Sequence, residues 1–273
     1  MSIFRAACVQ LRSSDDMVEN IRVTTNLVRE AKGRGAQFIA TPENTTLMAP
    51  DGGAKLERSL PEDRDPALPA FRALAKELDV WLLIGSLAIK VSDSKTANRS
   101  FLIDPSGRVA AQYDKIHMFD VDLPSGEIYR ESNTVAGGSR AVIADLPWGK
   151  VGLTICYDLR FPKLYRMLAQ NGAFMLTVPS AFTETTGKAH WHVLLRARAI
   201  ENGAFVIAPA QGGTHANGRQ TYGHSLIVAP WGEVIAEAGT EPGIIIADID
   251  PALVEAARGR VPNLQHDRAF EGP

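Results

Sequence analysis

The stretches AACVQL (residues 6–11) and QFIATPE (residues 37–43) decide the fold. Both are short apolar runs of the kind that form buried strands. The segment between them places apolar or small residues at helical spacing, namely Met17, Ile21, Thr24, Val28 and Ala31. Ser13 or Ser14 is expected to cap this helix. A strand–helix–strand unit favours a parallel strand pair with a right-handed crossover.

Antiparallel hairpins follow this unit along the chain. The turns at residues 105–107, 147–149 and 230–232 each separate two strand-like segments. Helices are expected from residue 65 to 79, from 162 to 171, from 187 to 202 and from 251 onward. So many strands do not fit one doubly wound sheet, and they predict an α/β fold in which two mixed sheets stack in a four-layer αββα sandwich. Residues 44–65 read as an irregular binding loop or lid, and residues 1–273 as one domain.

Composition narrows the class of protein. The 273 residues are 45% hydrophobic and 22% charged, with a net charge of -2, as in ordinary globular proteins. The chain has no basic block that would suggest binding to nucleic acid or to an anionic membrane. The start, MSIFRAACVQ, lacks the pattern of a signal peptide. We therefore expect a cytoplasmic protein in which Cys8 and Cys156 are free thiols.

Three residues stand where predicted strands end. Glu43 closes QFIATPE, Lys115 lies in YDKIHMF, and Cys156 lies in GLTICYDLRFP. Taken singly, each has an ordinary structural interpretation: Glu43 as a loop anchor, Lys115 as a solvated lysine and Cys156 as a buried thiol. Taken together, they fit one cleft and one reaction. The thiol is a nucleophile whose thiolate form an ammonium group favours, the carboxylate can move protons, and the lysine can stabilise an oxyanion.

Other catalytic patterns are weak or absent. His190 and His192 stand as H-x-H, but their flanks predict a helix, on which positions i and i+2 point apart. The sequence contains no H-E-x-x-H, no C-x-x-C and no G-x-S-x-G motif. Gly212 and Gly213 read as part of a flexible loop. We expect no metal and no cofactor.

These motifs resemble the nitrilase superfamily of carbon–nitrogen hydrolases, and its Nit amidase branch in particular. The resemblance rests on TPEN, YDKIHMFDVD and GLTICYDLRFP, and runs from AACVQL to the tail VPNLQHDRAF. It implies the αββα sandwich and association into a homodimer or larger homo-oligomer. One departure lies in PENTTLM, which has an asparagine after the glutamate. Nit proteins often have an apolar or acidic residue at that position.

The resemblance also implies roles. Glu43 would be the general base, Cys156 the nucleophile that forms a thioester, and Lys115 the oxyanion ligand, together with the backbone N–H of Tyr157. The second, supporting glutamate falls on Glu131 in YRESN, and Glu127 fits the pattern less well. The substrate-binding residues that we expect are Tyr157, Phe182 and Thr183.

The implied reaction is hydrolysis of a small carboxamide to an acid and ammonia. Deaminated glutathione or a related ω-amide of a 2-oxo acid is the expected substrate. The alternatives are an ω-amidase acting on 2-oxoglutaramate, a nitrilase, an N-carbamoyl amino-acid amidohydrolase, a metallohydrolase using His190 and His192, and an inactive binding module. The sequence leaves open which cation binds a substrate carboxylate, and the candidates are Arg130, Arg160, Lys188 and Arg219.

Overall fold

A computed structural model describes residues 2–124 and 126–273 of the chain. In these residues the strands form two large mixed sheets and two short ribbons. The first sheet has the spatial order β17 (Gly243–Ile249), β1 (Phe4–Gln10), β2 (Phe38–Ala40), β3 (Trp81–Lys90), β4 (Thr96–Ile103) and β5 (Val109–Asp114), and β8 (Val135–Ala136) pairs with β4. The second sheet has the order β16 (Val234–Glu237), β15 (Leu226–Val228), β12 (Phe205–Ala208), β11 (Ala173–Thr177), β10 (Gly149–Leu153) and β9 (Val142–Leu146).

Strand β1 shows how the sequence builds two cores on one sheet. Neighbouring side chains of a strand point to opposite faces. Ala6 and Cys8 belong to the apolar cluster that also contains the second sheet, whereas Ala7 and Val9 belong to the cluster under the helices of the first sheet. A strand buried on both faces has no alternation of polar and apolar residues, which is why AACVQL reads as a continuous apolar run.

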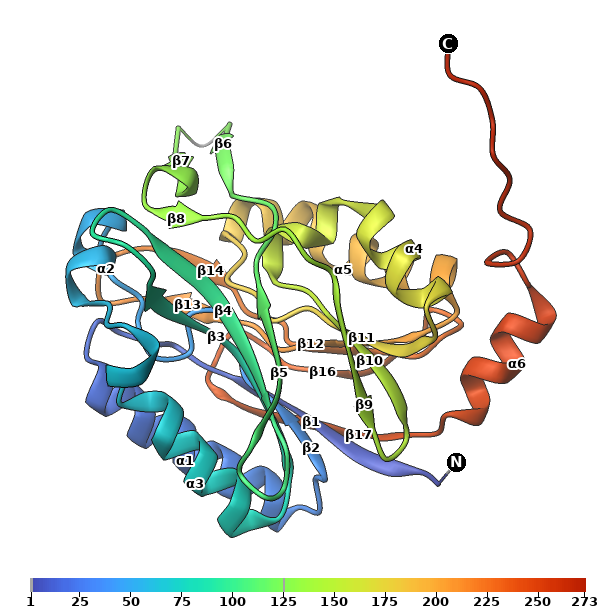
Figure 1. The fold of residues 1–273 in the computed structure, drawn as a ribbon, viewed down its shortest axis with the longest axis horizontal. Coiled ribbons are helices and arrows are strands. Elements are labelled where there is room, and N and C mark those ends of the chain that lie inside the picture. The colour runs from blue at the N-terminus through green and yellow to red at the C-terminus, as the bar shows by residue number, and fades with distance from the viewer. Residues whose placement is uncertain (1, 125) are drawn as a thin grey trace.

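Helices cover the outer faces of the stacked sheets (Figure 1). Helices α1 (Met17–Gly33) and α3 (Ala67–Leu78) pack beside each other over the first sheet. Helices α4 (Pro162–Gln170) and α5 (Glu184–Asn202) cover the second sheet, and α6 (Ala252–Arg260) follows β17. The predicted four-layer arrangement is confirmed, and so is the parallel pairing of β1 with β2. Among the described residues, no helix is both long and apolar enough to cross a membrane.

Some local predictions were wrong. Residues 44–65 are not wholly irregular, because they contain α2 (Gly52–Arg58) and a short 3-10 helix, Glu62–Arg64. Helix α2 buries none of its residues and so carries no apolar periodicity that the sequence could reveal. Helix α1 is capped by Asp16, which accepts a hydrogen bond from the Glu19 N–H, and not by Ser13 or Ser14.

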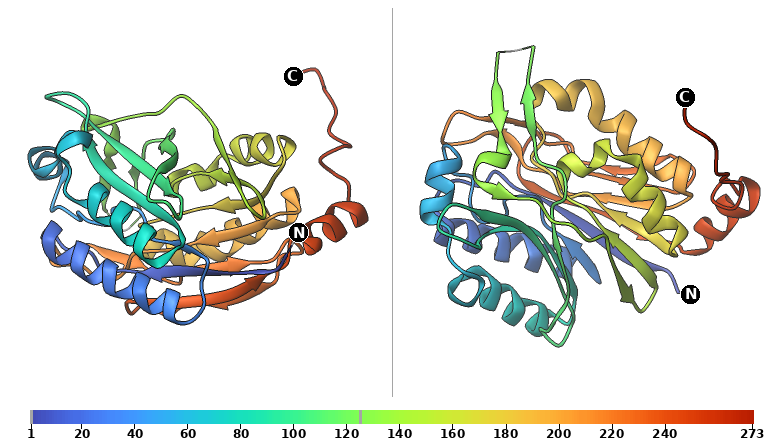
Figure 2. Two further views of the ribbon diagram at one scale, coloured as in Figure 1. Left: turned by 60° about the horizontal axis from the view of Figure 1, so that its bottom comes forward. Right: turned by 45° about the horizontal axis from the view of Figure 1, so that its top comes forward.

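Two ribbons were also missed. Strands β13 (Gly212–Thr214) and β14 (Gln220–Tyr222) pair within the segment expected to be a flexible loop. Strands β6 (Asp120–Asp122) and β7 (Ile128–Arg130) form the second ribbon, which projects beyond the body of the fold (Figure 2). Their strands are only three residues long, too short for a recognisable alternation.

Candidate active site

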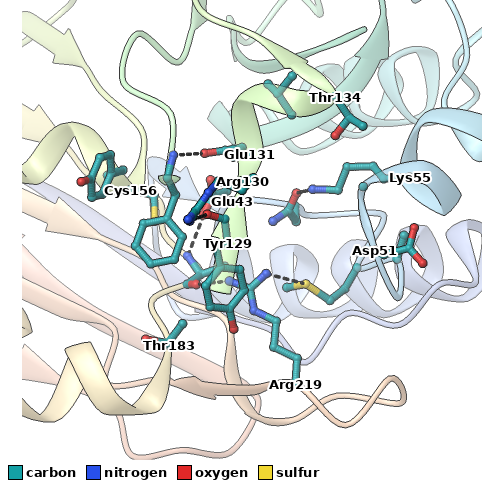
Figure 3. A pocket seen from close by; sticks show the side chains of 18 of the residues that line it. Glu43, Asp51, Lys55, Tyr129, Arg130, Glu131, Thr134, Cys156, Thr183 and Arg219 are labelled. Atoms are coloured by element: carbon teal, nitrogen blue, oxygen red, sulfur yellow. Dashed lines mark hydrogen bonds between the residues drawn. The ribbon is translucent and has the colours of Figure 1, made fainter. Parts of the chain in front are cut away.

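Segments that leave three strands carry the candidate catalytic residues. Glu43 follows β2, Lys115 directly follows β5, and Cys156 follows β10. Because β2 and β5 belong to the first sheet and β10 to the second, the site lies where the two sheets meet. Figure 3 shows Cys156, Glu43 and Glu131 around one pocket.

Lys115 lies at the centre of a buried ion cluster. Its side chain is 2% exposed, and its Nζ lies 2.9 Å from Glu43 Oε1 and 2.8 Å from Glu131 Oε2. Burial lowers the pKa of Lys115, but the charges of Glu131 and Glu43 outweigh this effect and raise that pKa well above its usual value. Asn98 Nδ2 also donates to Glu43 Oε1 at 2.8 Å. The ammonium group is therefore charged and fixed in direction.

Glu43 connects the two sheets. Its Oε2 accepts a hydrogen bond of 3.0 Å from the backbone N–H of Ala181, which follows β11 of the second sheet. Burial raises the pKa of Glu43, but the positive charge of Lys115 and hydrogen bonds to the carboxylate act in the opposite direction and lower it to about 2. The carboxylate is therefore ionised near neutral pH and can accept a proton.

Cys156 is held in an unusual backbone conformation. Its φ is 49°, in the left-handed region that non-glycine residues rarely occupy, and its N–H donates to the Pro179 carbonyl at 3.0 Å. It begins the 3-10 helix η3 (Cys156–Arg160) and is 7% exposed. A strained backbone conformation at a candidate nucleophile indicates a functional constraint.

The thiol carries its proton in the resting site. Burial and the negative charge of Glu43 raise the pKa of Cys156, and they outweigh the opposing charge of Lys115. The expectation that the ammonium group favours a thiolate was therefore incomplete, because the lysine charge is already balanced by two carboxylates. The resting pair is a neutral thiol beside an ionised carboxylate.

Asp158 holds the turn that carries the candidate nucleophile, and it was not found from the sequence. Its buried carboxylate accepts hydrogen bonds from the Ile155 N–H, the Tyr113 hydroxyl and the His117 N–H. Tyr113 and His117 flank Lys115, so Asp158 connects the turn that carries Cys156 to the segment that carries Lys115. The available signal was an acidic residue two positions after the cysteine, in a turn where a side-chain acceptor can satisfy backbone N–H groups.

A cavity of about 410 Å³ opens onto this cluster. Its lining includes Cys156, Glu43, Lys115 and Glu131, and the three residues predicted to bind substrate, Tyr157, Phe182 and Thr183. A cavity of this size is within the range of small-molecule sites. Glu127 instead accepts a hydrogen bond from the Tyr129 hydroxyl, and Cys8 lies in the core with its thiol 3.8 Å from the Leu226 carbonyl.

Comparison with known proteins identifies the family. Residues 5–259 match the carbon-nitrogen hydrolase family. The chain belongs to the carbon-nitrogen hydrolase family. A deaminated glutathione amidase of Synechocystis sp. is 41% identical over 270 residues, which are 97% of this chain and 98% of that protein.

Solved structures agree on the fold. The NitFhit protein of C. elegans superposes with a TM-score of 0.91 at 34% identity, covering 98% of this chain, which spans 66% of that longer protein. Nit3 of Saccharomyces cerevisiae, a member of branch 10 of the nitrilase superfamily, has a TM-score of 0.86 at 28% identity, over 95% of this chain and 94% of that one. The predicted family, fold and enzyme class are confirmed: this carbon-nitrogen hydrolase is an amidase that acts on small amides, outside peptide bonds.

The four cations that are candidates for binding a substrate carboxylate do not all lie in the cavity of this hydrolase. Arg130 pairs with Asp122 at 2.7 Å, and Lys188 pairs with Glu184 at 2.7 Å on the surface of α5. Arg160 lies over the rings of Tyr157 and Phe182 and faces His190. Arg130 and Arg219 line the cavity, and so does Lys55, which sequence reasoning missed because it lies on the unrecognised helix α2.

The two histidines of the H-x-H motif point to different partners. His190 Nδ1 lies 3.3 Å from the Arg160 guanidinium, whereas His192 Nε2 lies 3.0 Å from Glu237 Oε1. Both are on α5, as the helical reading predicted. His192, His224 and Glu237 bring one potential ligand atom each within 4.8 Å of one another, so these described residues could hold a metal ion. None of the three lines the cavity that contains Cys156.

Proposed function

We propose that this amidase hydrolyses deaminated glutathione or a related ω-amide of a 2-oxo acid through a thioester on Cys156. The observation that carries the mechanism is the contact set of Glu43, Lys115 and Cys156 at the wall of one small-molecule cavity. The observation that supports this choice of substrate is the similarity to a deaminated glutathione amidase over nearly the full length.

Acylation begins with the neutral thiol. The Cys156 Sγ attacks the amide carbon while the thiol proton passes to Glu43, so that no free thiolate forms beside two carboxylates. The carbonyl electron pair moves to the oxygen, where Lys115 Nζ and the Tyr157 backbone N–H stabilise the developing negative charge. Glu43 then gives the proton to the amide nitrogen, the C–N bond breaks, and the amine departs.

In deacylation Glu43 again accepts a proton first and then donates it, with water as the nucleophile and the sulfur as the leaving group. Glu43 takes a proton from a water molecule as its oxygen attacks the thioester carbon, and the same two donors hold the oxyanion. The C–S bond breaks, the sulfur recovers its proton from Glu43, and the carboxylic acid product leaves. Glu131 holds Lys115 through both carboxylate oxygens, at 2.8 and 3.0 Å, and thus orients the ammonium group in both steps.

The leaving group depends on the substrate. In deaminated glutathione the amide nitrogen belongs to cysteinylglycine, so hydrolysis of that bond releases this dipeptide and 2-oxoglutarate. Ammonia, which we expected from the sequence for a carboxamide in general, is released only from primary amides such as 2-oxoglutaramate. An assay must therefore follow free amine as well as ammonia.

A substrate panel tests the proposed function. The purified chain is incubated with deaminated glutathione, 2-oxoglutaramate, a nitrile and an N-carbamoyl amino acid, and the products are quantified by mass spectrometry. We expect the highest kcat/KM for deaminated glutathione. A higher kcat/KM for 2-oxoglutaramate would support the ω-amidase alternative, and turnover of only the nitrile or the carbamoyl compound would contradict the proposal.

We also infer that residues 1–273 form one domain and that the chain assembles into a homodimer or larger homo-oligomer in the cytoplasm. Exposed apolar side chains on the outer helices support self-association. Val193 and Ile200 are seven residues apart on α5, and so share one face, with exposures of 69% and 52%. Sedimentation equilibrium tests the assembly, and a monomeric mass at micromolar concentration would contradict it.

A further inference from the structure

Two cations of the cavity have no carboxylate partner. Lys55 and Arg219 both line the cavity, and within residues 2–124 and 126–273 neither forms an ion pair. In contrast, Lys115 and Arg130, the other cations of the lining, are both paired with carboxylates. A buried or partly buried cation without a counter-ion is costly unless a ligand supplies the negative charge.

Lys55 extends from α2 toward the catalytic cluster (Figure 3). Its Nζ donates to Asn44 Oδ1 at 2.8 Å, which engages one of the three donors of an ammonium group. Asn44 is the residue at which this chain departs from the usual Nit pattern, and its φ of 56° places it in the left-handed region. Burial lowers the pKa of Lys55 and outweighs the negative charges of Glu131 and Glu43, which act in the opposite direction but do not pair with it directly.

Arg219 extends into the same cavity from the loop before β14. One terminal nitrogen donates to the Ala181 carbonyl at 2.9 Å, and the guanidinium lies 5.4 Å from the centre of the Tyr129 ring. Its Nε is buried and has no hydrogen-bond partner among the described residues. The other terminal nitrogen donates only to the weak acceptor Met48 Sδ, at 3.9 Å. The ring and the carbonyl thus fix a planar donor group that has no charged partner of its own among the described residues.

The charges of the cavity are complementary to an anion. Glu43 and Glu131 already balance Lys115 and exceed it by one negative charge, so Lys115 has no surplus positive charge to offer a substrate carboxylate. Asp51 also lines the cavity, but its carboxylate accepts the Ala54 N–H at 2.9 Å as the cap of α2 and is not paired with Lys55. The available positive charge of the lining is therefore on Lys55 and Arg219.

We propose that Lys55 and Arg219 form the subsite that binds a carboxylate group of the amide substrate. The inference rests on the proposed amidase function and deepens it, because it assigns substrate selection to residues apart from the reacting atoms. In Figure 3, Lys55 and Cys156 lie on opposite sides of Glu43, so an anion at Lys55 leaves the thiol accessible to the amide carbon.

Deaminated glutathione has a carboxylate at each end, and matched amides distinguish them. Glutaryl-cysteinylglycine has both carboxylates. Pentanoyl-cysteinylglycine replaces the acyl carboxylate by a methyl group, and glutaryl-cysteinylglycine amide removes the charge of the glycine end. Release of the free amine is measured for all three with the wild type, Lys55→Met, Arg219→Gln and, as a matched control, Lys188→Met.

We expect Lys55→Met and Arg219→Gln each to lower kcat/KM for glutaryl-cysteinylglycine by roughly 10- to 100-fold, chiefly through KM, because a hydrogen bond to a charged group is lost. On the analogue that lacks the bound carboxylate, these variants and the wild type should be equally active. That analogue also identifies which end of the substrate is bound. Lys188→Met should match the wild type on all three.

Two outcomes would overturn the inference. Equal losses on all three amides would show that Lys55 only balances the charges of Glu43 and Glu131, and no loss on any amide would show that neither cation contacts the substrate. A binding measurement is independent of turnover: calorimetry of glutaryl-cysteinylglycine with Cys156→Ala, with and without Lys55→Met. A weaker affinity in the double variant supports the subsite, whether or not the wild type hydrolyses the amides. If the wild type hydrolyses none of them, that result refutes the proposed function and leaves the subsite supported.

Discussion

At the scale of single residues, Glu43 is the side chain on which most of the site converges. Asn98 and Lys115 approach it from the first sheet, and Ala181 donates to it from the second. The sequence could indicate Glu43, Lys115 and Cys156 because each follows a strand and lies in a specific motif. It gave only a weak signal for Asp158, because two of its partners, Tyr113 and His117, are distant in the sequence. It gave none for Lys55, which lies on the unrecognised helix α2.

Replacing Glu43 by glutamine tests its role as the proton acceptor. The amide keeps the size of the side chain but cannot take the thiol proton, so we expect the rate of amide hydrolysis to fall by at least roughly 100-fold. Steady-state kinetics measure this loss, and circular dichroism checks that the variant is folded. A folded Glu43→Gln enzyme with a wild-type rate would contradict the assigned role.

The same residue makes stability depend on pH. The pKa of Glu43 is about 2 in the folded protein, against an ordinary value of 4.5. A lowered carboxylate pKa stabilises the fold above the unfolded value, and this stabilisation is lost as the pH falls from about 4.5 toward 2. Urea unfolding between these pH values should therefore show a shallower loss of stability for Glu43→Gln than for the wild type. Identical slopes would show that the Glu43 charge makes no net contribution.

At the scale of elements, long segments were predictable and short ones were not. The strands and helices that bury a regular face, such as β3 and α3, have periodic or continuous apolar patterns. Helix α2 has no buried residue and the ribbon strands are only three residues long, so neither has an apolar pattern. The turn η3 is defined by hydrogen bonds rather than by apolar residues. The elements that complete the cavity are therefore the ones that carry the weakest sequence signal.

A substitution at Gly85 of β3 tests how closely the segments that precede Glu43 and Ala181 pack against this strand. A Cβ atom at this position would lie 2.0 Å from the Thr41 carbonyl oxygen and 2.5 Å from Pro179 Cβ. We expect Gly85→Ala to destabilise the fold by about 1–3 kcal/mol and to impair catalysis, because Thr41 and Pro179 precede Glu43 and Ala181. At Gly33, where nothing lies within 4 Å of the added Cβ, Gly33→Ala is the matched control. Thermal unfolding and kinetics check both variants, and equal behaviour would contradict the prediction.

At the scale of the whole molecule, the four layers followed from the mixture of crossover units and hairpins. What the sequence could not show is which side chains join the two sheets. One such contact is the stacking of Phe4 on Trp148, with ring centres 4.0 Å apart, between β1 of the first sheet and the β9–β10 turn of the second. Trp148 precedes β10 and Cys156 follows it, so this contact and the candidate nucleophile lie at opposite ends of the same strand.

Trp148 therefore allows stability to be separated from catalysis. Trp148→Ala should destabilise the protein by about 3–5 kcal/mol, as loss of a buried aromatic side chain does, while kcat/KM of the folded enzyme stays close to that of the wild type. Trp231, which is 51% exposed, is the control, since Trp231→Ala should change the unfolding free energy by less than about 0.5 kcal/mol. Denaturant unfolding compares the two, and similar losses would contradict the predicted core contact.

The central claim is tested most directly by the rate of amide hydrolysis in the two single-cysteine variants. Cys8 and Cys156 are both buried free thiols, but only Cys156 lines the cavity with Glu43 and Lys115. We predict that Cys156→Ala hydrolyses deaminated glutathione no faster than buffer alone, while Cys8→Ala, at a temperature where it remains folded, retains the wild-type rate within about threefold. Hydrolysis by folded Cys156→Ala at the wild-type rate would contradict the account.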